Sequence, residues 1–319
     1  MTHQEHETKA PVQRLEGLVV RAQSGFCVVE TDQGLFTAVL KGRFKKDRRH
    51  DGLVALGDRV AIARLDLPEG ESGQVDAIVV DILDRHSLIA RRAPGPKGIW
   101  LQDVVVANID LLVCVMASAD PPPNFRLLDR FLAVAAIDGI DALIVIGKVD
   151  LGIPAAAALA LAEYERIGYP VLRVSARTGE GLEALRVRLA GRISAVVGPS
   201  GVGKSSLINS LEPSHDQRVG AISEALGKGR HTTRVGELLA LTGGGKVADT
   251  PGLREMGVWR MDPGELEWAF LEFRPFLNQC RYSDCSHDHE PGCAVRAAVE
   301  AGAVSAERHD SYVRMLTDP

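Results

Sequence analysis

Residues 198–205 read Gly198-Pro199-Ser200-Gly201-Val202-Gly203-Lys204-Ser205, which fits the pattern G-x-x-x-x-G-K-[ST]. The apolar run 193–197 predicts a strand directly before this segment, and Ser206 begins a predicted helix directly after it. In this context the glycines let backbone N–H groups turn inward around a phosphate, and the helix N-terminus adds partial positive charge. We expect Lys204 to reach the β- and γ-phosphate oxygens and Ser205 to bind Mg²⁺. The pattern predicts a nucleotide site without specifying the base.

Two short motifs upstream of this loop favour guanine. The apolar run 142–146 leads into Gly147-Lys148-Val149-Asp150, a close variant of the Asn-Lys-x-Asp motif of guanine-specific folds. Asp150 would accept hydrogen bonds from the N1–H and N2–H₂ edge of guanine, a pair that adenine does not offer. On its own, the tetrapeptide is equally consistent with a strand end at which a lysine and an aspartate have no role in binding. The odds for a base site improve because Ser175-Ala176-Arg177 follows the next strand, where a Ser-Ala-[KR] loop covers guanine from the other side.

Two further segments lie downstream of the loop. The run Val247-Ala248-Asp249-Thr250-Pro251-Gly252 predicts a strand that ends in Asp-x-x-Gly, so Asp249 would hold Mg²⁺ through water and the Gly252 N–H would sense the γ-phosphate. A switch segment with an Mg²⁺-binding threonine is expected between the phosphate loop and this strand. The sequence there is Gly229-Arg230-His231-Thr232-Thr233, and either Thr232 or Thr233 would bind the ion. The base readers thus precede the phosphate loop and the switches follow it. This rotated order predicts a circularly permuted GTPase domain.

The spacing of apolar runs predicts three domains behind a disordered tail at residues 1–13. Short apolar runs with turn signals over 14–84 predict a small barrel of about five strands, of the OB type. Residues 85–256 predict a parallel α/β sheet, with strands over 104–116, 142–146, 171–175 and 193–197 and helices over 125–138, 155–168 and 181–192. Residues 257–319 predict a helical domain around a Cys/His cluster.

The five cysteines fall into two groups. Cys27 and Cys114 stand alone in apolar runs and are expected to be core thiols. In the C-terminal region, three thiols and one imidazole are sufficient for a closed, structural Zn²⁺ site at Cys280, Cys285, His287 and Cys293. By sequence alone, His289 is a rival fourth ligand, and a set of reduced buried cysteines without metal is the alternative to the site itself.

Overall charge does not indicate a nucleic-acid-binding protein, because the 319-residue chain carries a net charge of −5. A local RNA-binding patch is nevertheless predicted in the basic run Lys41-Gly42-Arg43-Phe44-Lys45-Lys46-Asp47-Arg48-Arg49-His50, with Arg85, Arg91, Arg92 and Lys97 as extensions. The alternative for this run is an ordinary solvated surface. The N-terminus is polar and no apolar run is long enough to span a bilayer, so we expect a cytoplasmic protein with no membrane contact.

The segments 198–206, 229–233, 249–252, 100–110 and 280–293 together resemble the circularly permuted ribosome-assembly GTPases of the RsgA (YjeQ) family, over nearly the whole chain. The resemblance implies GTP and GDP as ligands, Mg²⁺ and one structural Zn²⁺, with His287 favoured over His289. It also implies that the protein binds the small ribosomal subunit and its rRNA late in maturation, with subunit-stimulated hydrolysis. We expect His231, with Lys204 and Thr233, to carry hydrolysis, unless His231 merely fills a loop. We also expect a monomer.

Two positions affect the predicted nucleotide affinity and the predicted rate of hydrolysis. Gly147 stands where the family has asparagine, so we expect GTP binding to persist but to be weakened. Leu253 follows Gly252 where Ras-like enzymes use a water-orienting glutamine, although an apolar residue here is typical of the family. Slow intrinsic turnover is therefore expected. Two other classes remain: an RNA-docking module that hardly turns over, and a small-molecule kinase, against which the two base-reading motifs argue.

Overall fold

The computed structural model describes residues 14–23, 25–40, 54–65, 75–94, 100–213, 236–249 and 263–317. Several predicted features lie outside these residues. They are the tail 1–13, the basic run 41–50, Lys97, the segment 229–233 and residues 250–253.

The N-terminal region forms a closed barrel of five strands: β1 (Arg14–Gln23), β2 (Phe26–Thr31), β3 (Gly34–Leu40), β4 (Arg59–Arg64) and β5 (Ala77–Ile82). The strand order is β1-β2-β3-β5-β4, and β4 closes the barrel by pairing with β1. Its interior is filled by alternate residues of the strands, among them Val19, Val29, Val60 and Ile62. The prediction of an N-terminal OB-type barrel is confirmed. Cys27 lies in this core, and burial raises the pKa of its thiol to about 12.

The central region is a mainly parallel sheet in the order β10-β9-β8-β11-β13-β12, in which only β12 runs antiparallel. Its strands are β8 (Leu111–Ala117), β9 (Asp141–Gly147), β10 (Val171–Arg173), β11 (Ile193–Val197), β12 (Gly236–Ala240) and β13 (Lys246–Asp249). The central strand β8 is buried along its whole length and includes Cys114, the second predicted core thiol. A sheet covered by helices on both faces explains these continuous apolar runs.

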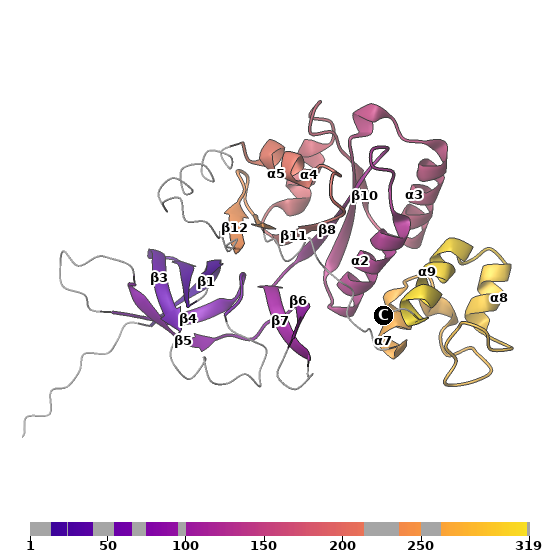
Figure 1. Cartoon of the computed structure of the whole chain (residues 1–319), viewed down its shortest axis with the longest axis horizontal. Helices are drawn as coiled ribbons and strands as arrows, with labels where there is room; N and C mark the ends of the chain where they lie inside the picture. The colour runs from indigo at the N-terminus through magenta and orange to yellow at the C-terminus, as the bar shows by residue number, and fades with distance from the viewer. Residues whose placement is uncertain are drawn as a thin grey trace, which may run out of the picture.

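Two pairs of helices cover the two faces of this sheet (Figure 1). On one face lie α2 (Phe125–Ile137) and α3 (Ala155–Ile167), which bury Leu128, Leu132 and Leu161. On the other lie α4 (Leu182–Leu189) and α5 (Lys204–Leu211), which bury Leu185 and Leu207. The side chain of Asn124 caps α2 by accepting a hydrogen bond from the Leu127 N–H, which explains why this helix begins where it does.

The segment predicted as one strand over 104–116 is in fact two strands. The first, β7 (Trp100–Ala107), pairs with β6 (Leu88–Pro94) in a separate two-stranded sheet, and β8 begins only at Leu111. The chain turns at Asn108, which has a φ of 54° and whose amide donates to the Gly57 carbonyl at 2.9 Å. Asp110 then accepts the Ile193 N–H at 2.8 Å. The two polar residues therefore mark a turn that is anchored to its neighbours, and the strand prediction was wrong there.

The barrel and the α/β sheet are joined edge to edge. Strand β1 pairs antiparallel with β12, so that the two form one eleven-stranded sheet, and the barrel lies beside β12 in Figure 1. An ion pair between Arg21 and Glu237, at 2.8 Å, lies at this seam, and a second joins Lys246 to Glu30 at 2.7 Å. The barrel is thus hydrogen-bonded to β12, which begins at Gly236, shortly after the predicted switch segment 229–233 along the chain.

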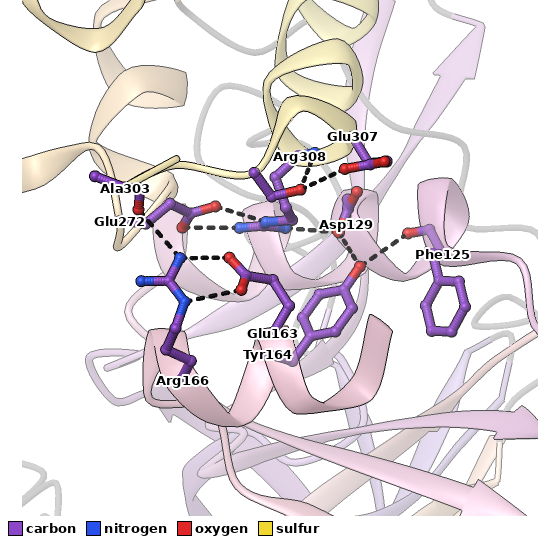
Figure 2. A network of polar contacts seen from close by, with 10 residues as sticks. Phe125, Asp129, Glu163, Tyr164, Arg166, Glu272, Ala303, Glu307 and Arg308 are labelled. Atoms are coloured by element: carbon purple, nitrogen blue, oxygen red, sulfur yellow. Dashed lines mark hydrogen bonds and ion pairs between the residues drawn. The ribbon is translucent and has the colours of Figure 1, made fainter. Parts of the chain in front are cut away.

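The C-terminal region consists of α7 (Pro263–Ala269), a 3₁₀ turn η4 (Arg274–Phe276), α8 (Ala294–Glu300) and α9 (Ala306–Thr317). Its core is aromatic, built on Phe270, Phe273 and Tyr312. It packs against α2 and α3 through the polar network of Figure 2, in which Arg308 lies between Glu272 and Asp129. Among the described residues, no helix combines the length and apolar character that crossing a membrane requires.

Candidate nucleotide site and metal centre

The phosphate loop connects β11 to α5, as the sequence predicts. Gly198 has a φ of 146°, and a Cβ at this position would lie 2.2 Å from the Val115 carbonyl oxygen, so only glycine fits. Gly203, with a φ of 99°, precedes the first turn of α5. The Lys204 ammonium donates 2.7 Å hydrogen bonds to the carbonyls of Gly198 and Pro199. The loop therefore curls around a positive charge at a helix N-terminus, the arrangement that accepts phosphate.

The predicted base-reading segment lies at the end of the neighbouring part of the sheet. Strand β9 ends at Gly147, and Asp150 sits in the 3₁₀ turn η2 (Val149–Leu151). The two oxygens of Asp150 accept hydrogen bonds from the Ser175 hydroxyl at 2.6 Å and the Arg177 Nε at 2.8 Å. The Ser175 bond, followed by the charge of Arg177, holds the pKa of the Asp150 carboxyl below its usual value. Asp150 is thus an ionised acceptor, held in place by the Ser-Ala-Arg loop.

The base-reading segment and the phosphate loop lie in contact, although some fifty residues separate them along the chain. A Cβ built on Gly147 would lie 3.4 Å from the Val202 carbonyl oxygen, and one on Gly203 would lie 3.8 Å from the Lys148 Cε. The stem of Lys148 therefore passes over the phosphate loop. Strand β8 lies between β9 and β11 in the parallel sheet, so all three carboxyl ends meet at one edge. Ligands of open α/β sheets bind at this edge.

Sequence reasoning missed a third contributor, the segment that follows β8. The Ser118 hydroxyl donates to the Lys148 carbonyl at 2.8 Å, and the Lys148 ammonium donates to the Asp120 carbonyl at 2.5 Å. Pro121 lies beside the loop, with its Cδ 3.7 Å from a Cβ built on Gly201. The signal was present in the sequence, because polar residues that follow a buried parallel strand lie at the ligand-binding edge.

Only some of the residues predicted to bind Mg²⁺ or to form the switches lie within the part of the chain that the structure describes. Ser205 lies in the first turn of α5, and Asp249 ends β13, which runs parallel to β11 beside the loop. The backbone of Asp249 is therefore at the same edge of the sheet as the phosphate loop. The other predicted members of this group lie outside the described residues: His231, Thr232, Thr233 and Gly252.

The four predicted zinc ligands lie together in the C-terminal domain. The ligand atoms of Cys280, Cys285, His287 and Cys293 are all within 4.8 Å of one another. The Nδ1 of His287 lies 3.5 Å from the Cys280 Sγ and 3.4 Å from the Cys293 Sγ. The rival His289 points away: its side chain is 80% exposed and contacts Asp288. Of the two histidines, only His287 faces the three sulfurs.

The surroundings of this cluster fit a tetrahedral Zn²⁺ site with no open position. The far nitrogen of His287, Nε2, lies 2.9 Å from the Glu267 carboxylate, the kind of second contact that orients a metal-binding imidazole. Backbone N–H groups of Ala294 and Arg296 point at the sulfurs of Cys280 and Cys293, at 3.3 and 3.4 Å. These donors favour thiolates, the form of cysteine that binds metal. A closed set of four ligands leaves no place for a reacting water, so a metal held here would have a structural role.

Comparison with known proteins agrees with this geometry. The RsgA GTPase family matches residues 82–259, and the RsgA N-terminal domain family matches residues 16–71. The small ribosomal subunit biogenesis GTPase RsgA of Gemmatimonas aurantiaca is 49% identical over 300 residues, which cover 94% of this chain and 95% of that protein. The protein of the same name from Moorella thermoacetica is 39% identical over 304 residues, with 95% and 97% covered.

Two solved structures share the fold over almost the whole chain. YjeQ from Thermotoga maritima superposes with a TM-score of 0.74 at 32% identity, covering 96% of this chain and 98% of its own. YloQ, described as a circularly permuted GTPase, gives a TM-score of 0.71 at 27% identity, with 100% and 97% covered. The permuted order predicted from the motifs and the predicted enzyme class, a GTP hydrolase, are confirmed. The chain belongs to the RsgA GTPase family.

Proposed function

We propose that this protein hydrolyses GTP to GDP and phosphate while bound to the small ribosomal subunit, late in the subunit's maturation, and that the subunit stimulates hydrolysis. The observation that carries the proposal is the meeting of an ionised Asp150 and the Lys148 stem with the phosphate loop at one sheet edge. The partner comes from the relatives in Gemmatimonas aurantiaca and Moorella thermoacetica, whose names specify small-subunit biogenesis.

In this proposal, different residues bind the base, the phosphates and the Mg²⁺ ion. Asp150 accepts the two N–H groups on the edge of guanine while the Lys148 stem lies along the ring. Gly198–Ser206 wrap the phosphates, and Lys204 exchanges part of its contact with the loop carbonyls for contact with the β- and γ-oxygens. Mg²⁺, when bound, neutralises charge on the transferred phosphoryl group, and Ser205, Asp249 and Thr232 or Thr233 would hold it.

The attacking water needs a residue to orient it, and Leu253 has no hydrogen-bonding group. We assign this role to His231, in the predicted switch segment, when the protein is bound to the small subunit. Without the subunit the reaction is slow, so rapid hydrolysis occurs only after the protein has bound the subunit. His231→Ala should therefore abolish stimulation by the subunit but leave nucleotide affinity unchanged. Full stimulation in that variant would show that another group orients the water.

We further propose that the cluster of Cys280, Cys285, His287 and Cys293 holds one structural Zn²⁺. The C-terminal region has a small aromatic core, so metal binding would contribute part of its folding free energy. Contact with rRNA is assigned to the barrel and to the basic run 41–50. Charge reversal at Arg48 and Arg49 should weaken subunit binding and flatten its dependence on salt.

The proposed activity is tested by measuring phosphate release by the full-length protein with GTP or ATP, alone and with purified small or large subunits. We expect slow release with GTP alone, an increase on addition of small subunits only, and none with ATP. Equal rates with small and large subunits would contradict the partner, and equal rates with the two nucleotides would contradict the base assignment. Nucleotide-dependent subunit binding without release would favour the RNA-docking module.

A further inference from the structure

We propose that Ser118 is a positioning residue that holds the base-reading turn, and that this chain depends on it because glycine occupies position 147. The inference rests on the proposed reading of guanine by Asp150. Ser118 follows β8, outside every motif that the sequence singles out, and touches the turn rather than the nucleotide.

The turn that carries Asp150 contains a backbone conformation that needs support. Lys148 has a φ of 59° and a ψ of 34°, in the left-handed region that side-chain-bearing residues rarely adopt. Such conformations persist only where the surroundings hold them. The 3₁₀ turn with Asp150 follows immediately, because the Leu151 N–H donates to the Lys148 carbonyl at 3.0 Å. A change in the backbone at Lys148 would therefore move the Asp150 carboxylate.

Ser118 holds this turn at two successive carbonyl groups. Its backbone N–H donates to the Gly147 carbonyl at 2.9 Å, and its hydroxyl donates to the Lys148 carbonyl at 2.8 Å. The two bonds fix the peptide groups on both sides of the left-handed residue. Ser118 is completely buried, so water does not compete for its hydroxyl group. The backbone bond survives substitution by any residue except proline, whereas the hydroxyl bond depends on the side chain.

Gly147 explains why the hydroxyl bond matters in this chain. A Cβ at position 147 would point toward the phosphate loop, 3.4 Å from the Val202 carbonyl oxygen and 3.7 Å from the Met116 carbonyl oxygen. An asparagine amide there would face those carbonyls and tie the end of β9 to the loop. Glycine supplies no such side chain and leaves the backbone freer. The Ser118 hydroxyl therefore carries a larger share of the restraint on the turn.

The test is a double-mutant cycle on the full-length protein, with Ser118→Ala, Gly147→Asn and both together. The measured quantities are the dissociation constant of N-methylanthraniloyl-GDP with Mg²⁺ and that of inorganic pyrophosphate, obtained by competition. We expect Ser118→Ala to weaken GDP binding roughly three- to tenfold, the value of one buried hydrogen bond, with pyrophosphate unchanged because it has no base. In the Gly147→Asn background the same substitution should cost less than about twofold.

Ser87→Ala is the matched control, because the buried Ser87 hydroxyl donates to the Ile109 carbonyl at 2.7 Å, away from the turn. It should lower the melting temperature about as much as Ser118→Ala does and leave GDP affinity unchanged. The inference is overturned if Ser118→Ala leaves GDP affinity unchanged, weakens pyrophosphate equally, or costs the same in both backgrounds. Failure of the proposed base assignment is separate: it would appear as an Asp150→Asn variant that keeps the wild-type preference for GDP over xanthosine diphosphate.

Discussion

Arg308 on helix α9 donates a 2.6 Å hydrogen bond to Asp129 on helix α2, and both side chains are almost completely buried. The same guanidinium forms an ion pair with Glu272, and the Tyr164 hydroxyl donates to Asp129 at 2.5 Å (Figure 2). Helix α2 follows the segment at Ser118–Pro121, which contacts Lys148 and the phosphate loop. The domain that contains the Cys/His cluster is therefore anchored to the helix that leads away from this segment.

Removal of the Arg308 charge should destabilise the contact between the two domains. In Arg308→Met, Asp129 and Glu272 would remain buried without a cation, and we expect a loss of about 3–5 kcal/mol in the free energy of unfolding. Urea denaturation followed by circular dichroism measures it. Arg314→Met is the control, because Arg314 pairs with Asp310 in an exposed position and should cost less than about 0.5 kcal/mol. Equal losses in the two variants would show that the network contributes little.

The contact between α2 and α7 should depend on pH through Asp138. Burial, with the nearby charge of Glu265 second, raises the pKa of Asp138 from 3.8 to about 6. The fold therefore disfavours the carboxylate, so its stability falls as pH rises from the ordinary pKa through the raised one.

Asp138→Asn removes this penalty and should stabilise the protein by about 1 kcal/mol at about pH 8, with allowance for partial exposure. The gain should vanish at about pH 4, where the aspartate is already protonated in the fold. Thermal unfolding of both proteins at the two pH values measures the difference. Asp141→Asn, at an exposed position, is the control and should change the free energy of unfolding by less than about 0.5 kcal/mol. A gain of the same size at both pH values would contradict the assignment.

The base assignment predicts an exchange of nucleotide preference. Asp150→Asn replaces an acceptor by an amide that can donate to the O2 of xanthine, so xanthosine triphosphate should bind better than GTP. We expect GTP affinity to fall roughly 100-fold, since two charge-assisted hydrogen bonds are lost. Competition against a fluorescent GTP analogue measures both affinities, and Asp141→Asn, at the other end of β9, serves as the control.

Asparagine at position 147 should strengthen nucleotide binding. The backbone at Gly147 is not in the left-handed region, and the nearest atom to an added Cβ is 3.4 Å away, so Gly147→Asn should fit after a small adjustment. Its amide would bond the Val202 carbonyl and brace the loop against the base-reading turn. We expect GDP to bind roughly three- to tenfold more tightly. Unchanged affinity for both GDP and GTP would show that the missing asparagine has no effect here.

Zinc removal should unfold the C-terminal domain and spare the other two. His287→Ala opens the set of ligands and should lower the metal content of freshly purified protein from about one Zn²⁺ per chain to well below it. His289→Ala, which alters only an exposed side chain, should leave the metal content unchanged. Proteolysis after chelation should release the C-terminal region from the intact protein first. Retained stoichiometric zinc in His287→Ala would disprove the ligand assignment.

The fold of the barrel and of the α/β sheet followed from the sequence because their signals are local. Alternating apolar residues and turn signals mark the five barrel strands, and the loop at 198–205 needs a strand before it and a helix after it. The one wrong element, the strand over 104–116, failed because apolar runs on both sides mask a turn that distant partners hold. Asn108 is fixed by Gly57 and His86, which lie in other parts of the chain.

The sequence by itself determined which groups are present: a phosphate loop, the carboxylate proposed to read the base, and three cysteines with histidines nearby. Tertiary structure decided what these groups touch. It selected His287 over His289 by facing one ring toward the sulfurs, and it placed Ser118 and Asp120 against Lys148. Hydrogen bonds of this kind join residues that are far apart in sequence and carry no pattern along the chain. Their partners are set by the packing of strand ends, which only the folded sheet brings together.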